Sequence, residues 1–305
     1  MLIDDLKVVL QVAEFKSIKQ AAESLDMSVA VASAAVKRVE KAYGVELFVR
    51  STRKLRLSSF GEKYIPQIEN ALVILNQVGQ SAKNEQNIID GDLRLAVPSD
   101  LGRNILLPWI DLFASKHPQL NIRLHITDST IDFYRDPVDM ALRYGAPGDS
   151  SMYGFKICDV PRILCASPYY VETYGMPVHL KDLDSHNSLL YQLHDTVHDI
   201  WEFSCRGITS KVKMRSNRTA NDADIVRRWC VAGYGIAMKS ALDMSDDLLS
   251  GNLVKLMPEY TPKPTELWLI CPSKQLITPM VRLLRESITD KCLTIINSLK
   301  KSGYL

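Results

Sequence analysis

A cluster of basic side chains between Lys37 and Lys63 suits contact with the phosphate groups of nucleic acid. It contains eight basic residues and three acidic ones, which gives the stretch a charge of +5 in a chain whose net charge is only +2. The basic residues are Lys37, Arg38, Lys41, Arg50, Arg53, Lys54, Arg56 and Lys63. Since the whole chain carries little net charge, binding to nucleic acid requires a local patch of this kind.

A second group of polar residues follows short apolar segments in the C-terminal two-thirds of the chain. In open α/β sheets, ligands bind beyond the carboxyl ends of the strands. Hydroxyl groups, carboxylates and free helix amides at these positions predict a cleft for a small polar or anionic ligand. The candidate residues are Ser99, Asp100, Thr127, Asp128, Ser167, Asn221 and Asp222. Capping of strand ends is the alternative role for Ser99 and Thr127.

The charges near this predicted cleft leave the class of its ligand open. Asp100, Asp128 and Asp222 disfavour a multiply charged anion. Either Arg103 or Arg143 would have to balance them, and Arg143, which ends another apolar segment, is included in the candidate site. The sequence therefore predicts a ligand cleft without naming the ligand.

Other reactive residues give weaker signals. The spacing of His194 and His198 would place two imidazoles on one face of a helix, but no glutamate follows His194 and no cysteine lies nearby. We therefore expect a solvated loop there and no metal site. Six cysteines occur without a tight pairing, which is typical of reduced thiols in the cytoplasm. Cys205 and Cys230 lie near basic residues, which leaves a redox sensor as an alternative.

Residues 2–60 predict short helices with defined ends. Ser17 suits the N-terminal cap of a second helix, with Gln20 completing a capping box. Ser28 is expected to cap a third helix, and Gly44 to end that helix in a left-handed conformation. Two short helices joined by a tight turn outline a helix-turn-helix, whose second helix enters the major groove of DNA.

The next two segments predict a wing and a long helix. Residues 46–57 are expected to form two short strands around a basic tip, and residues 61–87 one helix with an apolar seam. The seam consists of Ile65, Ile68, Leu72 and Leu75. A single helix cannot bury such a seam alone, so we expect it to pair with the same helix of a second subunit. Packing of the seam on the wing of its own chain is the alternative.

The remainder of the chain predicts an α/β domain. Apolar alternation at residues 93–97 and 122–126 flanks a helical pattern at 105–113, which is a β-α-β start. Further short strands are expected at 138–143, 163–166, 236–238 and 267–271. This alternation of strands and helices predicts a mainly parallel sheet.

Composition excludes several other classes of protein. The chain has 305 residues, of which 46% are hydrophobic, and this suffices for about two packed domains and excludes a disordered or collagen-like chain. The first ten residues include Asp4, Asp5 and Lys7 and lack the pattern of a signal peptide. No apolar run approaches the ~18 residues of a membrane helix. We therefore expect a cytoplasmic protein without membrane contact.

These features together resemble the LysR-type transcriptional regulators over nearly the whole chain. The N-terminal landmarks are Ala21-Ala22, Leu25, Ser28, Ser33, residues 36–40, Gly44, Leu47-Phe48, Arg50, Leu57-Ser58 and Gly61. The C-terminal landmarks include Leu93-Arg94-Leu95, Pro98, Gly102, His117-Pro118, Ala141-Leu142-Arg143, residues 166–169 and residues 232–237. So many landmarks in the same order make a chance match very improbable.

The resemblance implies three parts with separate tasks. A winged helix-turn-helix would occupy residues 1–60, a dimerising linker helix 61–87, and an effector-binding domain similar to periplasmic solute-binding proteins 88–305. That domain would have two lobes around a cleft. Lobe I would comprise about 91–162 and 268–305, and lobe II about 163–267.

The recognition helix departs from the family pattern. Where such helices commonly carry a polar or basic side chain, this one has Val29 and Ala34, which offer only methyl contacts to thymine. Its polar contacts are therefore expected from Ser28, Ser33 and Lys37, with a plain helix cap as the alternative for Ser28. Further contacts, to phosphates or in the minor groove, are expected from Arg38, Arg50, Arg53, Lys54 and Arg56.

The sequence thus predicts a sequence-specific transcriptional regulator. Its cleft ligand would shift the geometry of a homodimer or homotetramer on double-stranded DNA, with RNA polymerase as a further partner. Two alternatives remain, namely a DNA-binding redox or pH sensor and a ligand-binding α/β protein without a DNA function. The sequence shows no nucleophile-base pair and no cofactor motif, so we expect neither an enzyme nor a cofactor.

Overall fold

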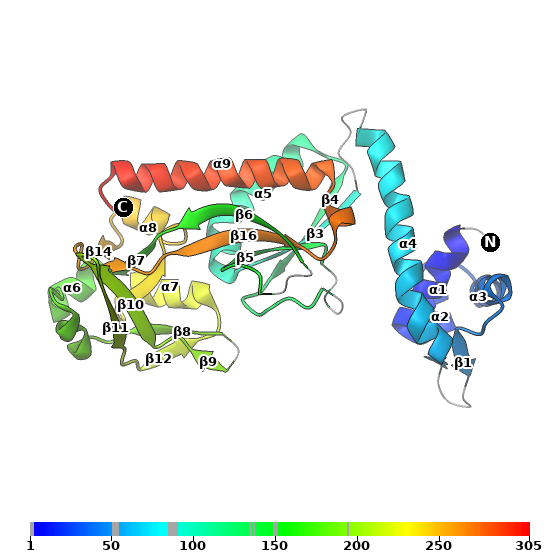
Figure 1. Ribbon diagram of the computed structural model, residues 1–305, viewed down its shortest axis with the longest axis horizontal. Coiled ribbons are helices and arrows are strands. Elements are labelled where there is room, and N and C mark those ends of the chain that lie inside the picture. The colour runs from blue at the N-terminus through cyan, green and yellow to red at the C-terminus, as the bar shows by residue number, and fades with distance from the viewer. Residues whose placement is uncertain are drawn as a thin grey trace. The chain divides into compact units, whose positions relative to one another are not determined.

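The computed structural model describes residues 3–50, 55–84, 91–133, 136, 138–148, 152–193 and 195–305. The chain divides into two compact units, Met1–Asn87 and Ile88–Leu305, which are coloured blue to cyan and green to red in Figure 1. Among the described residues, no helix combines the length and hydropathy needed to cross a membrane.

The N-terminal unit begins with three helices whose ends follow the predicted caps. They are α1 (Ile3–Phe15), α2 (Ile18–Ser24) and α3 (Val29–Tyr43). The Ser17 hydroxyl accepts a hydrogen bond from the Gln20 amide at 3.3 Å, and the Ser28 hydroxyl accepts one from the Val31 amide at 3.3 Å. Gly44 ends α3 with a φ of 67°. The positions of these caps are confirmed, although within the described residues the Gln20 side chain makes no return bond to Ser17.

The predicted wing is present as a two-stranded ribbon. Strands β1 (Phe48–Arg50) and β2 (Leu55–Leu57) pair antiparallel. The Glu40 carboxylate on α3 accepts hydrogen bonds from the Leu47 amide at 2.8 Å and the Phe48 amide at 3.2 Å, and so fixes where the wing begins. The predicted basic tip, residues 51–54, lies outside the described residues.

The long helix α4 (Ser59–Asn84) starts slightly earlier than predicted, and its apolar seam packs differently. Ile65, Ile68 and Leu72 are buried in the core of their own unit, together with residues of α1 and α3. A second subunit is therefore not needed to bury these three side chains. Leu75, the last predicted seam residue, is 46% exposed.

The C-terminal unit contains a five-stranded sheet in the order β4-β3-β5-β16-β6. Its strands are β3 (Gly91–Val97), β4 (Leu120–Ile126), β5 (Met140–Tyr144), β6 (Tyr153–Val160) and β16 (Thr265–Cys271). Strand β3 runs parallel to β4 and β5, whereas β16 runs antiparallel to β5 and β6. The expectation of a mainly parallel sheet is therefore wrong, because the chain returns from the second lobe through β16 in the opposite direction.

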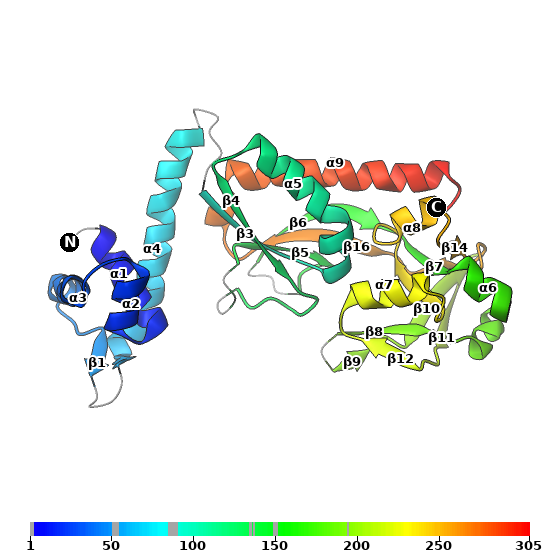
Figure 2. The same cartoon turned by 180° about the vertical axis from the view of Figure 1, so that it is seen from behind.

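Helices cover this sheet. Residues Leu101–Leu106 form a π-helical turn, η1, that continues into α5 (Leu107–Lys116), and Figure 2 shows α5 in front of the sheet. The long helix α9 (Pro279–Lys301) follows the short turn η3 (Lys274–Leu276). Leu284 and Ile288 of α9 pack in the core of the sheet, whereas Leu299 packs in the core of the second lobe. Helix α9 therefore belongs to both lobes, not to lobe I alone.

The second lobe consists of three small sheets and short helices. The sheets have the orders β13-β7-β14, β12-β8-β9 and β11-β10-β15. Their strands are β7 (Arg162–Ala166), β8 (Leu189–Leu193), β9 (Thr196–Val197), β10 (Ile200–Cys205), β11 (Ile208–Lys213), β12 (Arg218–Ala220), β13 (Ala237–Ser240), β14 (Val254–Lys255) and β15 (Thr261–Pro262). The helices are α6 (Pro168–Tyr174), η2 (Leu180–Ser185), α7 (Ala223–Val231) and α8 (Ser245–Leu249). The α/β class and the two-lobed architecture are as predicted.

Candidate functional site

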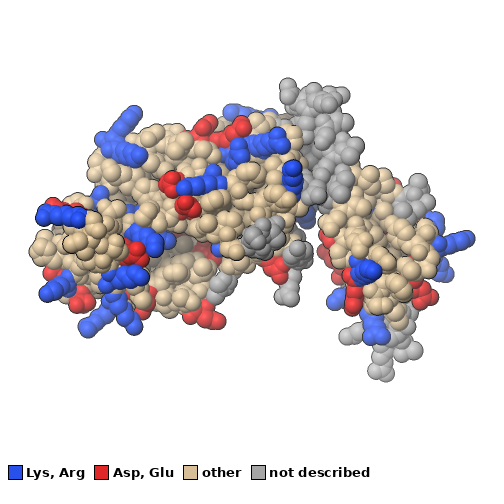
Figure 3. All heavy atoms as spheres, viewed as in Figure 1, with Lys and Arg blue, Asp and Glu red and all other residues tan. Residues whose placement is uncertain are grey.

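Helix α3 presents an exposed face at its N-terminal end. Ser28, Val29 and Val31 are exposed there, with Val29 at 47% and Val31 at 51%, while Ser33 is half-buried and Lys37 is exposed. Two exposed valines at the start of a helix suit methyl contacts in a DNA groove. In Figure 3, Lys and Arg side chains project from the side of the N-terminal unit that carries α3 in Figure 1.

Arg38 pairs with Asp5, a contact that the sequence did not reveal. Its guanidinium donates to both carboxylate oxygens of Asp5, at 3.0 and 2.5 Å, and so joins α3 to α1. The hydrogen bond from Asp5 raises the pKa of Arg38, although partial burial opposes this. About half of the Arg38 side chain remains exposed, so its predicted contact with phosphate stays a prediction alongside this structural role.

Of the other basic residues predicted to contact DNA, the structure describes two. Arg56 is exposed on β2, and Arg50 ends β1. Arg53 and Lys54 belong to the wing tip and lie outside the described residues.

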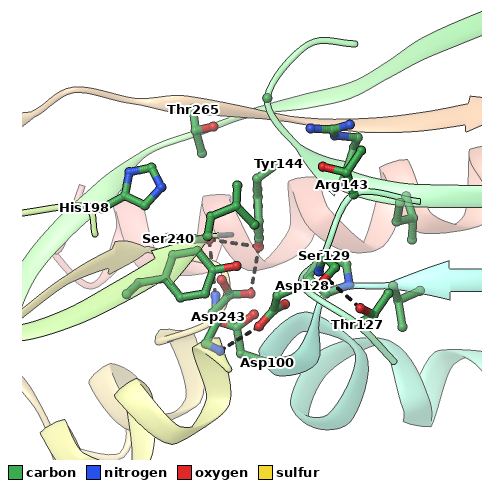
Figure 4. Close-up of a pocket in the computed structure, with 18 of the residues that line it drawn as sticks. Asp100, Thr127, Asp128, Ser129, Arg143, Tyr144, His198, Ser240, Asp243 and Thr265 are labelled. Atoms are coloured by element: carbon green, nitrogen blue, oxygen red, sulfur yellow. Dashed lines mark hydrogen bonds between the residues drawn. The ribbon is translucent and has the colours of Figure 1, made fainter. Parts of the chain in front are cut away.

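The C-terminal unit contains a cleft of about 610 Å³ between its lobes. This volume lies within the range of roughly 300–1,000 Å³ that is usual for sites of small molecules. Among the predicted residues, Asp100, Thr127, Asp128 and Arg143 line the cleft (Figure 4). The rule that ligand sites follow the carboxyl ends of strands therefore located the cleft.

The remaining predicted residues lie beside the cleft instead of lining it. Ser167 caps α6 and accepts a hydrogen bond from the Tyr170 amide at 3.2 Å. Asp222 caps α7 and pairs with Arg103 at 2.9 Å. Asn221 lines a smaller neighbouring pocket of about 240 Å³. The contact of these three residues with an effector stays a prediction, because a position after a strand gives the edge of the sheet but not the direction of the side chain.

Ser99 is buried and holds the first turn of α7. Its hydroxyl accepts hydrogen bonds from the amides of Ala223 at 2.9 Å and Asp224 at 3.2 Å, and donates to Asp128 at 2.6 Å. Asp128 also accepts from the amides of Ser99 at 2.8 Å and Ala223 at 2.7 Å. Ser99 thus caps a helix across the lobes, which is a different role from the strand-end capping considered for it, and its contact with an effector stays a prediction.

A buried cluster of charged and hydroxyl groups forms one wall of the cleft, and its composition was missed by the sequence analysis. Lys239 pairs with Asp100 and also donates to the carbonyl oxygen of Ala223 at 2.9 Å. In Figure 4, the Tyr144 hydroxyl points toward Ser240 and Asp243, and it donates to the Asp243 carboxyl at 2.7 Å. Tyr144 belongs to β5, Asp100 caps η1, Lys239 and Ser240 belong to β13, and Asp243 lies in the turn that follows β13. These groups meet only in the folded chain, so no local pattern reveals them.

The pKa values of this cluster are shifted by burial and by its neighbours. Burial raises the pKa of Asp243 well above its usual range, and the charge of Asp100 raises it further. Burial opposes the charge on Lys239, but the Asp100 carboxylate next to it keeps the pKa of Lys239 above its usual value. The cluster therefore holds one ion pair, Lys239 with Asp100, beside Asp243, whose surroundings favour the protonated form of its carboxyl.

The cysteines do not favour the redox alternative. Cys230 is fully buried, and the neighbouring Cys165 thiol and burial both raise its pKa. Cys158 has a pKa lowered by a hydrogen bond with the Cys292 thiol, but both are buried. Cys205 is partly exposed. Because oxidants react with exposed thiolates, the buried thiols of Cys158, Cys165, Cys230 and Cys292 are poorly suited to sensing.

The predicted histidine pair is only partly described. His198 lines the cleft, where burial and the neighbouring Arg162 lower its pKa. His194 lies outside the described residues. Among the described residues, no group of three or more His, Cys, Asp or Glu side chains is placed to hold a metal ion.

Comparisons with known proteins match both units. Residues 3–62 match the family model "Bacterial regulatory helix-turn-helix protein, lysR family", and residues 87–293 match "LysR substrate binding domain". The chain therefore belongs to the LysR family of DNA-binding transcriptional regulators.

Particular relatives agree with this assignment. The chain is 29% identical to the HTH-type transcriptional regulator DmlR of Escherichia coli K12, over 93% of this chain and 92% of the relative. Among solved structures, it is similar to the full-length Vibrio cholerae virulence activator AphB, with a TM-score of 0.57, 25% identity and coverage of 95% and 99% of the two chains. It is also similar to CrgA of Neisseria meningitidis, with a TM-score of 0.62, 25% identity and coverage of 94% and 98%.

Proposed function

We propose that this LysR-type regulator reads DNA through α3 and its wing, and that a small molecule in the cleft controls this reading. The observation that carries the proposal is the exposed N-terminal face of α3, capped by Ser28 and bordered by Lys37. A recognition helix of this kind places its first residues against base edges. The polar contacts are assigned to Ser28, Ser33 and Lys37. The contacts to the phosphates or the minor groove of DNA are assigned to Arg38, Arg50, Arg53, Lys54 and Arg56.

The effector would act through the contact between the two lobes. A ligand shifts an equilibrium between arrangements only when it binds one of them better than the other. The cleft is lined by β5 of one lobe and by β7 and β13 of the other, so closure of the lobes changes the contacts that a ligand makes. We assign the effector site to Asp100, Thr127, Asp128 and Arg143, and we propose that its occupancy alters a homo-oligomer on DNA and its contact with RNA polymerase.

The DNA-binding part is tested by titrating salt against binding of the full-length protein to the DNA upstream of its own gene. Lys37→Ala should weaken binding and reduce the slope of log affinity against log salt by about one unit if Lys37 contacts one phosphate. The double variant Arg53→Ala, Lys54→Ala should reduce it by about two units.

The matched control is Lys300→Ala, which removes one exposed lysine from α9 in the other unit. It should leave both affinity and slope unchanged. Equal binding to a random duplex, together with equal slopes for Lys37→Ala and Lys300→Ala, would contradict the assignment of α3 as the reading helix.

A further inference from the structure

Two arginines from opposite lobes line the cleft without a partner in the part of the chain that the structure describes. Arg143 comes from β5 and Arg162 from β7. Within the described residues, neither guanidinium makes a hydrogen bond or an ion pair. Arginine side chains inside a protein are normally paired, because an unpaired charge away from water is costly.

The acidic groups of the cleft are already satisfied by other partners. Asp100 is paired with Lys239, and Asp128 accepts hydrogen bonds from Ser99 and Ala223. Asp243 accepts the Tyr144 hydroxyl, and burial raises the pKa of its carboxyl. The lining therefore carries three basic side chains, Arg143, Arg162 and Lys239, and neither Asp100 nor Asp128 pairs with either arginine in the described part of the chain.

Arg162 forms no ion pair with a carboxylate of the described residues. Burial lowers its pKa, and the group whose charge acts on it most is the hydroxyl of Tyr144, not an acid. His198 lies close enough for the charge of Arg162 to lower its pKa. A guanidinium held in this way gains most from an anion that offers two oxygens in one plane.

The rest of the lining sets limits on the body of such a ligand. Phe133, Trp201 and Met238 provide apolar surface, and Thr127 and Thr265 provide hydroxyl groups. Asp100 and Asp128 lie in the same cleft and repel a compact, multiply charged anion such as a phosphate. The lining thus suits an anion of low charge with a partly apolar body.

We propose that the effector of the cleft is a small organic carboxylate, bound by Arg162 of one lobe and Arg143 of the other. This inference rests on the proposed function, since it names the chemistry of the effector at the same site. A carboxylate that engages both guanidinium groups joins β5 to β7 and stabilises the arrangement of the lobes in which the two arginines are closest. It supplies the differential affinity that an effector needs.

The test is calorimetric titration of the full-length protein with a panel of probes in matched sets. Each set contains a carboxylate with an aliphatic, hydroxylated or aromatic body, its neutral amide and the corresponding amine, and inorganic phosphate is titrated beside them. We expect at least one carboxylate to bind and its amide, its amine and phosphate to bind at least about tenfold more weakly.

Three variants locate the binding. Arg162→Gln and Arg143→Gln should each weaken binding of that carboxylate by about tenfold or more, and Arg162→Lys should retain part of it. Arg282→Gln, which removes an exposed arginine from α9, is the matched control and should bind as the parent does. Unfolding temperatures without ligand show whether each variant is folded. If Arg162→Gln does not fold, Arg162→Lys takes its place in the test.

The outcomes separate this inference from the proposed function. Tighter binding of amides, amines or phosphate, or a carboxylate affinity that is unchanged in both glutamine variants, overturns the inference and leaves the effector cleft in place. The absence of binding by every probe overturns both the carboxylate assignment and the proposal that a small molecule occupies the cleft. DNA binding, measured separately, does not depend on either result.

Discussion

The titration of Asp243 tests how burial and a neighbouring charge change the pKa of one carboxyl. Because burial and Asp100 raise its folded-state pKa, the folded protein holds this proton more tightly than the unfolded chain. The stability that results is complete below the unfolded pKa near 3.8 and is lost as the pH rises through the folded pKa.

We expect Asp243→Asn to remove this dependence on pH. The amide cannot ionise but keeps an oxygen for the Tyr144 hydroxyl. Between the two pKa values the parent should lose up to about 1.4 kcal/mol of unfolding free energy per pH unit relative to the variant. Unfolding temperatures of both proteins from about pH 5 to about pH 9 measure this. A constant difference over that range would mean that Asp243 is already ionised in the folded state.

Arg38 is a residue whose structural role and DNA role can be separated. Arg38→Gln removes the guanidinium that holds the buried Asp5 carboxylate to α3, and we expect a lower unfolding temperature. The double variant Asp5→Asn, Arg38→Gln should recover part of the loss, because it also removes the buried charge that Arg38 stabilised. Thermal unfolding measures both. A double variant no more stable than Arg38→Gln would show that the ion pair is not what Arg38 contributes.

The sequence predicted residues with a local role and residues that follow the strands of the sheet, such as Asp100 and Thr127, which line the cleft. Ser28 and Gly44 act on the backbone within their own turn, so a few neighbouring letters were sufficient to identify them. Asp243 and Arg162 acquire their properties from neighbours far along the chain. A lone aspartate in the sequence gives no sign that it will be buried beside another carboxylate.

At the scale of elements, Gly61 couples the wing to the start of α4. A Cβ at this position would lie 2.2 Å from the carbonyl oxygen of Leu47, so alanine cannot be accommodated unless the backbone moves. We expect Gly61→Ala to cost about 1–3 kcal/mol of stability and to weaken DNA binding through displacement of the wing. Chemical denaturation and operator binding measure the two effects.

Gly148→Ala is the control for this change. A Cβ there meets no atom of the described residues within 4 Å, and the position lies in the C-terminal unit. It should change neither stability nor DNA binding appreciably. Equal stability of the two alanine variants would contradict the close packing of α4 on the wing.

A second contact between elements joins η1 of one lobe to α7 of the other. Arg103 donates to Asp222 at 2.9 Å, and Asn104 donates to Asp224 at 2.8 Å. We expect Arg103→Gln to loosen this contact and to speed hydrogen exchange in the first turn of α7, with Arg123→Gln on the exposed face of β4 as the control. Unchanged exchange in Arg103→Gln would mean that Ser99 and Lys239 hold the lobes together without it.

The elements themselves were largely predictable, and their directions were not. The expected strands at 163–166 and 267–271 correspond to β7 and β16. Alternation of apolar residues identifies such a strand, but it does not tell which neighbour the strand pairs with or in which direction. The antiparallel course of β16 depends on the path through the whole second lobe.

At the scale of the whole molecule, the question is what surface brings two chains together. Ile65, Ile68 and Leu72 are buried within their own unit. We therefore expect α4 to pair with a second chain through residues in its C-terminal half. Leu75 lies there and is exposed. A pair of chains joined at this point would place two reading helices on one duplex and raise the apparent affinity through bivalency.

We therefore expect Leu75→Glu to shift the protein toward the monomer and to shorten its footprint on DNA. Leu293→Glu is the matched control, since Leu293 is 45% exposed on α9 and Leu75 is 46% exposed on α4. Light scattering after size exclusion gives the mass of each variant, and nuclease footprinting gives the length of protected DNA. If Leu75→Glu keeps the mass and footprint of the parent while Leu293→Glu loses them, assembly depends on the C-terminal unit, and α4 serves the fold of its own chain.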